Sequence, residues 1–341
     1  MKKILVTGGS GFIGTNFINF LSKKKISILN IDKISKVSTP EKFKKIYYKN
    51  NYKFYKNNLN DTKKIYEILI KYKPDYIVNF AAESHVDRSI DDPIYFIKNN
   101  VNSATNLFHA YNKYYKSKKI KLFHISTDEV YGSIEKGESK EYDVYNPSSP
   151  YSASKSCGGL IAASFNKAFG SEMKTVHLAN NYGPYQFPEK YIPTLISSFL
   201  KNKKAPIYGK GMNIREWMFV DESCKAIWKI IISKKKFEKI NVGSGIRLTN
   251  LEISEKVFKI MKAKKLTNLK DKNFIKKVKD RPGHDERYAL NTIFFRKNIK
   301  YRIQNNLYKT LEDTIDWYIE NDKWMKNINK LYKNKRQGLI D

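Results

Sequence analysis

The sequence is poor in cysteine and lacks long apolar runs, and each shortage excludes a class of protein. Only two cysteines, Cys157 and Cys224, stand in 341 residues, which leaves no disulfide framework and no cysteine-based metal site. We therefore predict a protein of the reducing cytoplasm with no bound metal. No apolar run approaches the ~20 residues that a membrane helix needs, so we also expect no membrane partner.

Acidic residues are scarce as well. The chain has 33 of them against 65 lysines and arginines, a formal net charge of +32. Such an excess can indicate a nucleic-acid surface, but here the lysines are scattered and no nucleic-acid-binding motif accompanies them. We expect a solvated basic surface and no nucleic-acid partner. The alternative from another class is a regulator or nucleic-acid-binding protein that kept its fold and lost catalysis.

What the first half does contain is a regular alternation of apolar strands and helical segments. Continuous apolar strands between helices indicate a parallel sheet that is covered on both faces. We therefore predict an α/β fold of the Rossmann type, with a doubly wound parallel sheet. The strands are expected at 3–7, 27–31, 52–55, 76–80, 121–126 and 174–178, and the helices at 12–24, 62–72, 94–116 and 151–169.

The second half is less regular, because loops with glycine and proline separate its helices. We expect these helices at 191–201, 221–233, 250–262 and 308–320, and a solvated helix and loop in the lysine-rich stretch 262–279. The predicted division is an N-terminal domain over 1–178 and a smaller C-terminal α/β substrate-binding lobe over 179–325, with interleaved elements. Residues 326–341 are expected to form a tail.

A glycine-rich turn follows the first strand. "ILVTGGSGFIG" places Gly8, Gly11 and Gly14 between this strand and a helix, so that a pyrophosphate can rest on the helix N-terminus. Asp32 closes the second strand, where an acid suits the adenosine ribose hydroxyls and repels a 2′-phosphate. The pattern predicts NAD as the cofactor, although Lys33 beside the acid weakens the preference over NADP. A purely structural turn is the alternative.

A second motif, "YSASK", supplies Tyr151 and Lys155, which lie on one face of a helix, a turn apart. An ammonium beside the phenol, together with the charge of a nicotinamide, is expected to lower the tyrosine pKa. The pair follows a dinucleotide fold and a strand that ends in Ser126-Thr127. This order of parts resembles the short-chain dehydrogenase/reductase superfamily in its extended form, where the Ser/Thr binds the substrate hydroxyl and the tyrosine exchanges its proton.

Asp128 and Glu129 exceed what such a dehydrogenase needs. Two adjacent carboxyls at the open end of a strand can serve as one acid and one base, because their repulsion splits the two pKa values. Such a pair suits the removal of water across two neighbouring carbons.

Several longer motifs agree with this interpretation. Together they resemble the nucleotide-sugar 4,6-dehydratases, most closely those that act on dTDP-glucose, from residue 1 to about 320. The motifs are "AAESHVDRSI" (81–90), "STDEVYG" (126–132), "NNYGPYQFPEKYIP" (180–193), "YGKGMNIREWMFV" (208–220) and "DRPGHDERYAL" (280–290).

The resemblance implies a hydro-lyase that converts dTDP-glucose to its 4-keto-6-deoxy product. Tyr151 would take the 4-hydroxyl proton while the C4 hydride passes to NAD⁺. Glu129 would then remove the C5 proton, Asp128 would protonate the departing 6-hydroxyl, and the hydride would return to C6. Thr127 would hold the 4-hydroxyl, and Lys155 would bridge the ribose and assist Tyr151.

The resemblance also implies binding residues and a partner. The partner is a second copy of the chain, in a homodimer formed through 94–116 and 151–169. The cofactor residues would be Gly8, Gly11, Phe12, Ile13, Gly14, Asp32, Lys33, Asn58, Leu59, Ala81, Ala82, Ser84, Asn99, Tyr151, Lys155 and Asn181. The substrate residues would be Ser84, Thr127, Asn180, Glu189, Lys190, Pro206, Tyr208, Arg215, Asn250, Arg281 and His284.

Some positions depart from the family's pattern. They include the segment 34–39, Asn58-Leu59 in place of Asp-Ile, Asn99 in place of Thr, and Glu222 in place of His. None falls on the proposed catalytic residues, so the departures affect the identity of the nucleotide and not the reaction. UDP- or CDP-hexose stays open as substrate. A 4-epimerase and a UDP-glucuronate decarboxylase are the rival reactions.

Overall fold

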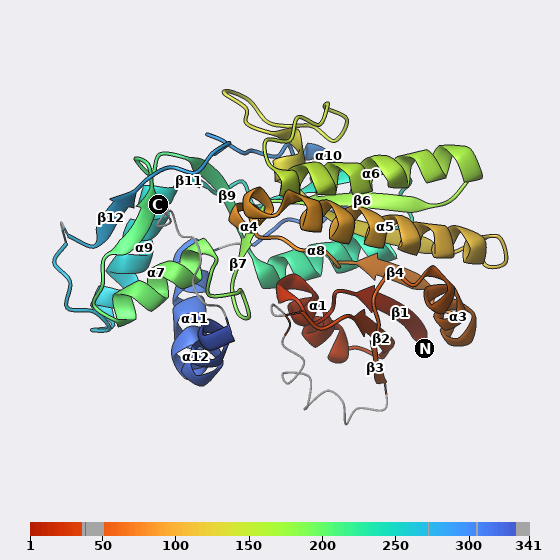
Figure 1. The fold of residues 1–341 in the computed structure, drawn as a ribbon, viewed down its shortest axis with the longest axis horizontal. Coiled ribbons are helices and arrows are strands. Elements are labelled where there is room, and N and C mark those ends of the chain that lie inside the picture. Colours follow the sequence, from red (N-terminus) through yellow and green to blue (C-terminus); the bar gives the residue numbers. More distant parts are fainter. Residues whose placement is uncertain (36–37, 39–50, 272, 305, 332–341) are drawn as a thin grey trace.

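The computed structural model describes residues 1–35, 38, 51–271, 273–304 and 306–331, so part of the divergent segment 34–39 lies outside the described residues. Its centre is a seven-stranded sheet in which every neighbouring pair is parallel. The order is β10 (Lys239–Val242), β6 (Met173–Leu178), β5 (Lys121–Thr127), β4 (Tyr76–Asn79), β1 (Lys2–Thr7), β2 (Ile26–Asp32) and β3 (Tyr52–Lys56) (Figure 1).

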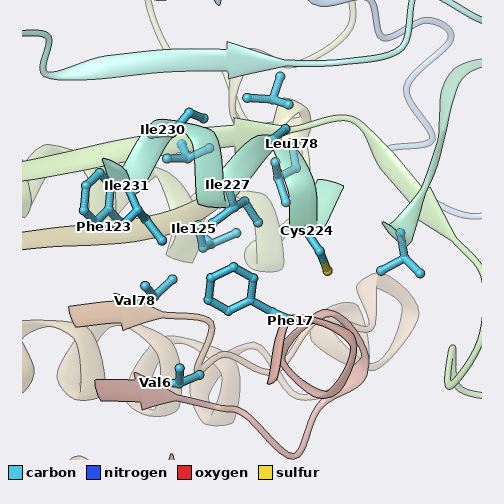
Figure 2. Close-up of a cluster of buried hydrophobic side chains, with 14 of the residues drawn as sticks. Val6, Phe17, Val78, Phe123, Ile125, Leu178, Cys224, Ile227, Ile230 and Ile231 are labelled. Carbon is cyan, nitrogen blue, oxygen red and sulfur yellow. The ribbon is translucent and has the colours of Figure 1, made fainter. Parts of the chain in front are cut away.

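Helices cover both faces of this sheet because alternate strand residues point to opposite sides. Ile4 and Val6 of β1 pack in one apolar cluster and Leu5 packs in another. The first cluster, drawn in Figure 2, includes Phe17 and Ile227. It joins the sheet to α1 (Phe12–Ser22), α8 (Val220–Ile232) and α10 (Ile293–Ile299), and the second joins it to α3 (Thr62–Tyr72), α5 (Pro93–Tyr115) and α6 (Pro150–Phe169). The predicted doubly wound fold is confirmed.

Local signals set the helix ends. The Ser149 hydroxyl accepts from the Ser152 amide at the start of α6, Pro150 follows the cap, and Gly170 ends the helix in the left-handed region. Outside the lysine-rich stretch 262–279, each strand and helix predicted by its range is present, with ends within two residues of the prediction.

The second lobe has its own apolar core. Figure 1 shows it beside the large sheet, on the left. Its helices are α7 (Tyr191–Leu200), α9 (Asn250–Ala263), α11 (Leu307–Glu320) and α12 (Asp322–Leu331). Its strands form two small sheets, β11 (Arg247–Thr249), β9 (Ile214–Phe219) and β7 (Asn180–Tyr182), and β12 (Ile275–Val278) with β8 (Ala205–Tyr208).

The lysine-rich stretch differs from its prediction. Residues 275–278 were expected in a helix or loop and instead form β12, which pairs in parallel with β8. The pairing joins positions about 70 residues apart, Ile275 with Ala205, and no local pattern of lysines signals it.

The two halves interleave along the chain. β9 of the small lobe ends at Phe219, and α8 begins at Val220 and packs on the large sheet's core; β10 then joins the sheet beside β6. The strand order reverses direction between β1 and β4, which marks a crevice at the carboxyl ends of the strands. Within the described ranges, no helix combines the length and apolarity required to cross a bilayer.

Candidate active site

The glycine turn has the close packing that a phosphate cradle requires. Gly8 has φ +69°, and a Cβ on it would lie 2.5 Å from the Ala81 backbone nitrogen. A Cβ on Gly14 would collide with the Gly8 carbonyl. Gly11 caps α1 without a side-chain acceptor, so the first amides of the helix are open to an anion.

Asp32 is committed to the surrounding backbone. Its carboxylate accepts hydrogen bonds from the Ser10 amide at 3.0 Å and the Ile34 amide at 2.8 Å, and from the Ser38 hydroxyl at 3.3 Å. Burial raises the pKa of Asp32, and these bonds oppose the rise. Asp32 therefore joins the glycine turn to the loop after β2, at the end of the cavity where the adenosine ribose was expected.

Most of the predicted cofactor residues line one cavity. They are Gly8, Gly11, Phe12, Ile13, Gly14, Asp32, Lys33, Asn58, Leu59, Ala81, Ala82, Ser84, Asn99, Tyr151 and Lys155. Asn181 is the exception, because it lines the adjoining cavity and its amide nitrogen donates to the Ala179 carbonyl. The small residues of this lining fit a dinucleotide, as does the buried Ser126 hydroxyl, which has no partner among the residues that the structure describes.

An amide, a lysine and a carboxylate on the adenosine side are coupled. Lys33 Nζ donates to Asn99 Oδ1 at 2.6 Å and lies 3.4 Å from the Glu83 carboxylate. The substitution of asparagine for the expected threonine at position 99 therefore provides an acceptor for Lys33. The Lys33 ammonium thus pairs with Glu83, while its charge still acts on Asp32 and opposes the rise of the Asp32 pKa.

The acid pair stands on a single 3₁₀ turn, η2 (Asp128–Tyr131), directly after β5. The Thr127 hydroxyl donates to Asp128 Oδ1 at 3.0 Å and accepts from the Glu129 amide at 3.3 Å. Asp128 Oδ2 is buried without a hydrogen-bond partner among the described residues. Glu129 is partly exposed and faces the second cavity.

The environments of the two acids differ. Burial, followed by the charge of Glu129, raises the pKa of Asp128 well above its ordinary value. Burial also raises the pKa of Glu129, but the cations Arg281, Lys190 and Arg215 oppose that rise. The arrangement therefore favours a protonated Asp128 beside an ionised Glu129, the split that the sequence predicts.

Tyr151 and Lys155 lie on α6 beside this turn, and both are buried. Lys155 Nζ donates to the Ile125 carbonyl at 2.7 Å, and burial lowers the pKa of Lys155 to about 8. Burial and the charges of Glu129 and Asp128 raise the pKa of Tyr151, whereas a hydrogen bond with Thr127 lowers it. In the protein without cofactor, desolvation and the neighbouring acids therefore keep the pKa of Tyr151 high, and the lowering expected with a bound nicotinamide stays a prediction.

The second cavity is rich in cationic side chains from the small lobe. Arg215 Nη2 donates to the Asp285 carbonyl at 2.9 Å, and its guanidinium stacks over the Tyr288 ring at 4.3 Å. Arg281 Nη1 lies 3.3 Å from Asp87 Oδ1, and its buried Nε has no partner in the described part of the chain. Two guanidinium groups held in this way suit the two phosphates of a nucleotide diphosphate.

Most predicted substrate residues line this second cavity. They are Asn180, Glu189, Lys190, Pro206, Tyr208, Arg215, Asn250, Arg281 and His284. Ser84 lines the first cavity instead, and Thr127 lines neither, although it contacts Asp128. Glu189 and Lys190 line both cavities and so mark where they meet.

Sequence reasoning gave no role to Asp87 and Arg88, which the structure places between the lobes on α4 (Val86–Asp91). Asp87 accepts from the Tyr208 hydroxyl at 2.6 Å and pairs with Arg281. Arg88 Nη2 pairs with Glu189 at 2.7 Å. The only available signal was their position inside the motif "HVDRSI".

Comparison with known proteins gives the family. The family described as GDP-mannose 4,6 dehydratase matches residues 5–314. A probable dTDP-glucose 4,6-dehydratase of Sinorhizobium fredii is 35% identical and aligned over 99% of each chain. The crystal structure of dTDP-glucose 4,6-dehydratase from Streptomyces venezuelae, solved with NAD bound, has a TM-score of 0.88 at 32% identity and covers 96% of this chain and 99% of that one.

A UDP-glucose 4-epimerase of Thermotoga maritima shares the fold alone. Its TM-score is 0.84, but its identity is 22%, over 94% of this chain and 99% of that one. The dehydratases are thus nearer in sequence than this representative of the rival reaction, and the resemblance drawn from the motifs is confirmed. The chain belongs to the nucleotide-sugar 4,6-dehydratases of the extended short-chain dehydrogenase/reductase superfamily.

Proposed function

We propose that the protein is an NAD-dependent dTDP-glucose 4,6-dehydratase that forms dTDP-4-keto-6-deoxyglucose and water. One observation carries the proposal: Asp128 and Glu129 stand side by side in different electrostatic environments next to Tyr151, with Tyr151 lining the first cavity and Glu129 the second. The names and bound NAD of the relatives support it.

NAD would be held by the residues that line the first cavity, and it would supply the acceptor and later the donor of a hydride. The chain's own residues move the protons. Tyr151 takes the proton of the 4-hydroxyl, which Thr127 orients, and Lys155 holds Tyr151 and the ribose in place. The raised pKa of Tyr151 in the protein alone makes the positive charge of an oxidised nicotinamide important for this step.

Elimination falls to the acid pair. A ketone at C4 acidifies the C5 proton, and the ionised Glu129 accepts that proton. Asp128, protonated in its buried position, gives its proton to the departing 6-hydroxyl, which leaves as water. When the hydride returns to C6, a proton is delivered to C5, which completes the 4-keto-6-deoxy sugar. Asp128 is the more deeply buried acid, and only Arg215 among the cations opposes the rise of its pKa, whereas Arg281, Lys190 and Arg215 all oppose the rise for Glu129.

The nucleotide diphosphate would bind in the second cavity. Arg215 and Arg281 supply the charge for the two phosphates, and Pro206 and Tyr208 lie where the base would bind. UDP- and CDP-hexoses remain the alternative substrates, because base preference depends on few contacts. An epimerase does not need the acid pair, and a decarboxylase removes a carboxylate rather than water.

The experiment is incubation of the purified protein with dTDP-glucose, UDP-glucose and CDP-glucose, with the products identified by mass and NMR. We expect a product that is one water lighter, with a 4-ketone and a 6-methyl group, and the fastest turnover with dTDP-glucose. Faster dehydration of UDP- or CDP-glucose would identify that nucleotide sugar as the preferred substrate. Absence of turnover with every hexose nucleotide, together with salt-sensitive DNA binding, would favour the non-enzymatic alternative.

We also propose a cytoplasmic homodimer. α5 and α6 lie side by side (Figure 1) and expose apolar side chains, among them Ile94 at 64%, Leu160 at 55% and Phe169 at 53%. Pairing with the same helices of a second copy would cover them. Analytical ultracentrifugation should give twice the chain mass of 39.9 kDa, and a Leu160→Glu variant should shift it toward the monomer.

A further inference from the structure

A buried chain of polar side chains connects the turn that carries the acids with the loop that leads into α6. His177 of β6 is fully buried, and its Nε2 lies 2.9 Å from the Tyr145 hydroxyl. Its Nδ1 lies 3.2 Å from the hydroxyl of Tyr131, the last residue of η2. The Tyr131 hydroxyl lies 3.0 Å from Asn241 Oδ1 on β10.

The direction of every bond in this chain can be derived. Asn241 Nδ2 donates to the Ser139 carbonyl at 2.9 Å, so Oδ1 is the acceptor for Tyr131. The Tyr131 hydroxyl also lies 3.4 Å from the Glu141 carbonyl, which, like Oδ1, can only accept. Its one proton therefore goes to one of these two oxygens, and it must accept from His177 Nδ1. His177 Nε2 is then an acceptor for Tyr145. Burial, with the nearby charge of Lys239, lowers the pKa of His177 to about 3, so the ring is neutral and held in one tautomer.

The two tyrosines flank the residues proposed for catalysis. Tyr131 ends the turn that begins with Asp128, and Tyr145 precedes the Ser149 cap of α6. The backbone is tied at the same place, because the Asn146 amide donates to the Val130 carbonyl at 3.0 Å.

Two glycines provide the space for this packing. Gly132 has φ +74°, and a Cβ on it would collide with the Asn146 carbonyl. Gly159 stands in the interior of α6, where glycine is unfavourable, and a Cβ there would lie 3.1 Å from the Tyr145 hydroxyl. Glycine at position 159 of α6 therefore leaves the space that the Tyr145 phenol occupies.

We propose that His177 is a positioning residue: through Tyr131 and Tyr145 it sets the distance between the acid pair and Tyr151. His177 lines neither cavity, so it acts on the reaction through these neighbours. The inference rests on the proposed function, in which elimination requires the two carboxyls to reach the sugar that Tyr151 has helped to oxidise.

The main test compares His177→Phe with His177→Gln. Phenylalanine keeps the ring that packs against Tyr131 and Tyr145 at centroid distances of 5.1 and 5.7 Å, but it makes no hydrogen bond. Glutamine carries both a donor and an acceptor on its amide. We expect His177→Phe to lower kcat about 10- to 100-fold, the range of a misplacement of about 1 Å, with KM within about 2-fold. His177→Gln should recover part of this loss.

A kinetic isotope effect distinguishes positioning from stability. With substrate deuterated at C5, the isotope effect on kcat should rise in His177→Phe, because elimination becomes more rate-limiting. Tyr142→Phe is the matched control, since Tyr142 is 69% exposed in the same loop, and it should change neither value. A loss of activity that only follows the folded fraction, with an unchanged isotope effect, would overturn the proposal.

Two further measurements keep the test decisive. Nitrogen NMR of the parent protein should find His177 protonated on Nδ1, and the opposite tautomer would disprove the network without any assay of turnover. Tyr145→Phe removes one bond of the chain and should lower kcat less than His177→Phe does, with effects that are not additive in the double variant. Failure of the proposed function would be seen separately, in the parent protein's lack of dehydration.

Discussion

The two cavities are built by different means. The cofactor cavity owes its shape to small residues, such as Gly8, Gly14 and Ala81, that let one backbone segment approach another. The cavity next to it owes its character to charges, such as Arg281, that are oriented by partners in the other lobe, here Asp87. Added atoms should therefore impair binding in the first cavity, and loss of charge should impair binding in the second.

Glu129, close to where the cavities meet, should give the largest effect. Glu129→Gln keeps the shape but removes the proposed base, so we expect kcat to fall by about 10²- to 10⁴-fold while NAD stays bound. Steady-state kinetics and the NAD content of the purified variant measure the two properties. In the parent, kcat should fall as the pH drops through the raised pKa of Glu129, because the base becomes protonated.

The control for this variant is Glu135→Gln, an exposed acid in the loop that follows. It should leave kcat unchanged. Dehydration by Glu129→Gln at the parent rate would assign the C5 proton to another residue.

A Lys155 variant tests how much a buried charge in the cofactor cavity lowers the free energy of unfolding. Burial lowers the pKa of Lys155 from 10.5 to about 8. Between these two pH values the lysine is protonated in the unfolded chain but not in the folded one, so the stability of the parent protein rises with pH in this range. Below pH 8 the penalty is fully present, roughly 3 kcal/mol at about 1.4 kcal/mol per pKa unit. Lys155→Met should therefore unfold at higher urea than the parent at pH 7, while losing activity.

Repeating the urea unfolding of Lys155→Met and the parent at pH 9.5 distinguishes an effect of charge from an effect of packing. The stability difference between Lys155→Met and the parent should shrink as the lysine loses its proton in the folded state. A constant difference at both pH values would assign the effect to packing instead of charge.

Arg281 tests the charges of the second cavity. Hydrogen bonds to charged groups contribute about 1.5–3 kcal/mol, so Arg281→Ala should raise KM for the nucleotide sugar about 10- to 100-fold. It also leaves Asp87 without its cation. NAD binding should not change, because Arg281 does not line the first cavity. Isothermal titration with dTDP and with NAD separates the two effects, and exposed Arg296→Ala is the control.

Equal weakening of dTDP and NAD binding in Arg281→Ala would contradict the division of labour between the cavities. Unchanged affinity for dTDP would remove Arg281 from the diphosphate site.

The sequence predicts the features that depend on local patterns and misses those that depend on distant residues. Strands, helices and the glycine turn depend on local patterns, and they are present at the predicted positions. Asn181, predicted for the cofactor, lies in the middle of β7 and lines the second cavity, so its predicted role stays untested. The role of Asp87, the strand at 275–278 and the His177 network depend on partners 32 to 194 positions away, and no local pattern carries that information.

Glu222, outside both cavities, should give the smallest effect. It is buried at the start of α8, where its carboxylate accepts from the Tyr301 hydroxyl and the Gln304 amide at 2.9 Å each and pairs with Lys225 at 2.7 Å. Glu222→Gln keeps one acceptor oxygen and loses the ion pair. The variant should lower the free energy of unfolding in urea by about 1 kcal/mol and leave kcat and KM unchanged. A change in kcat or KM would show that the charge of Glu222 also affects the reaction, although Glu222 lies outside both cavities.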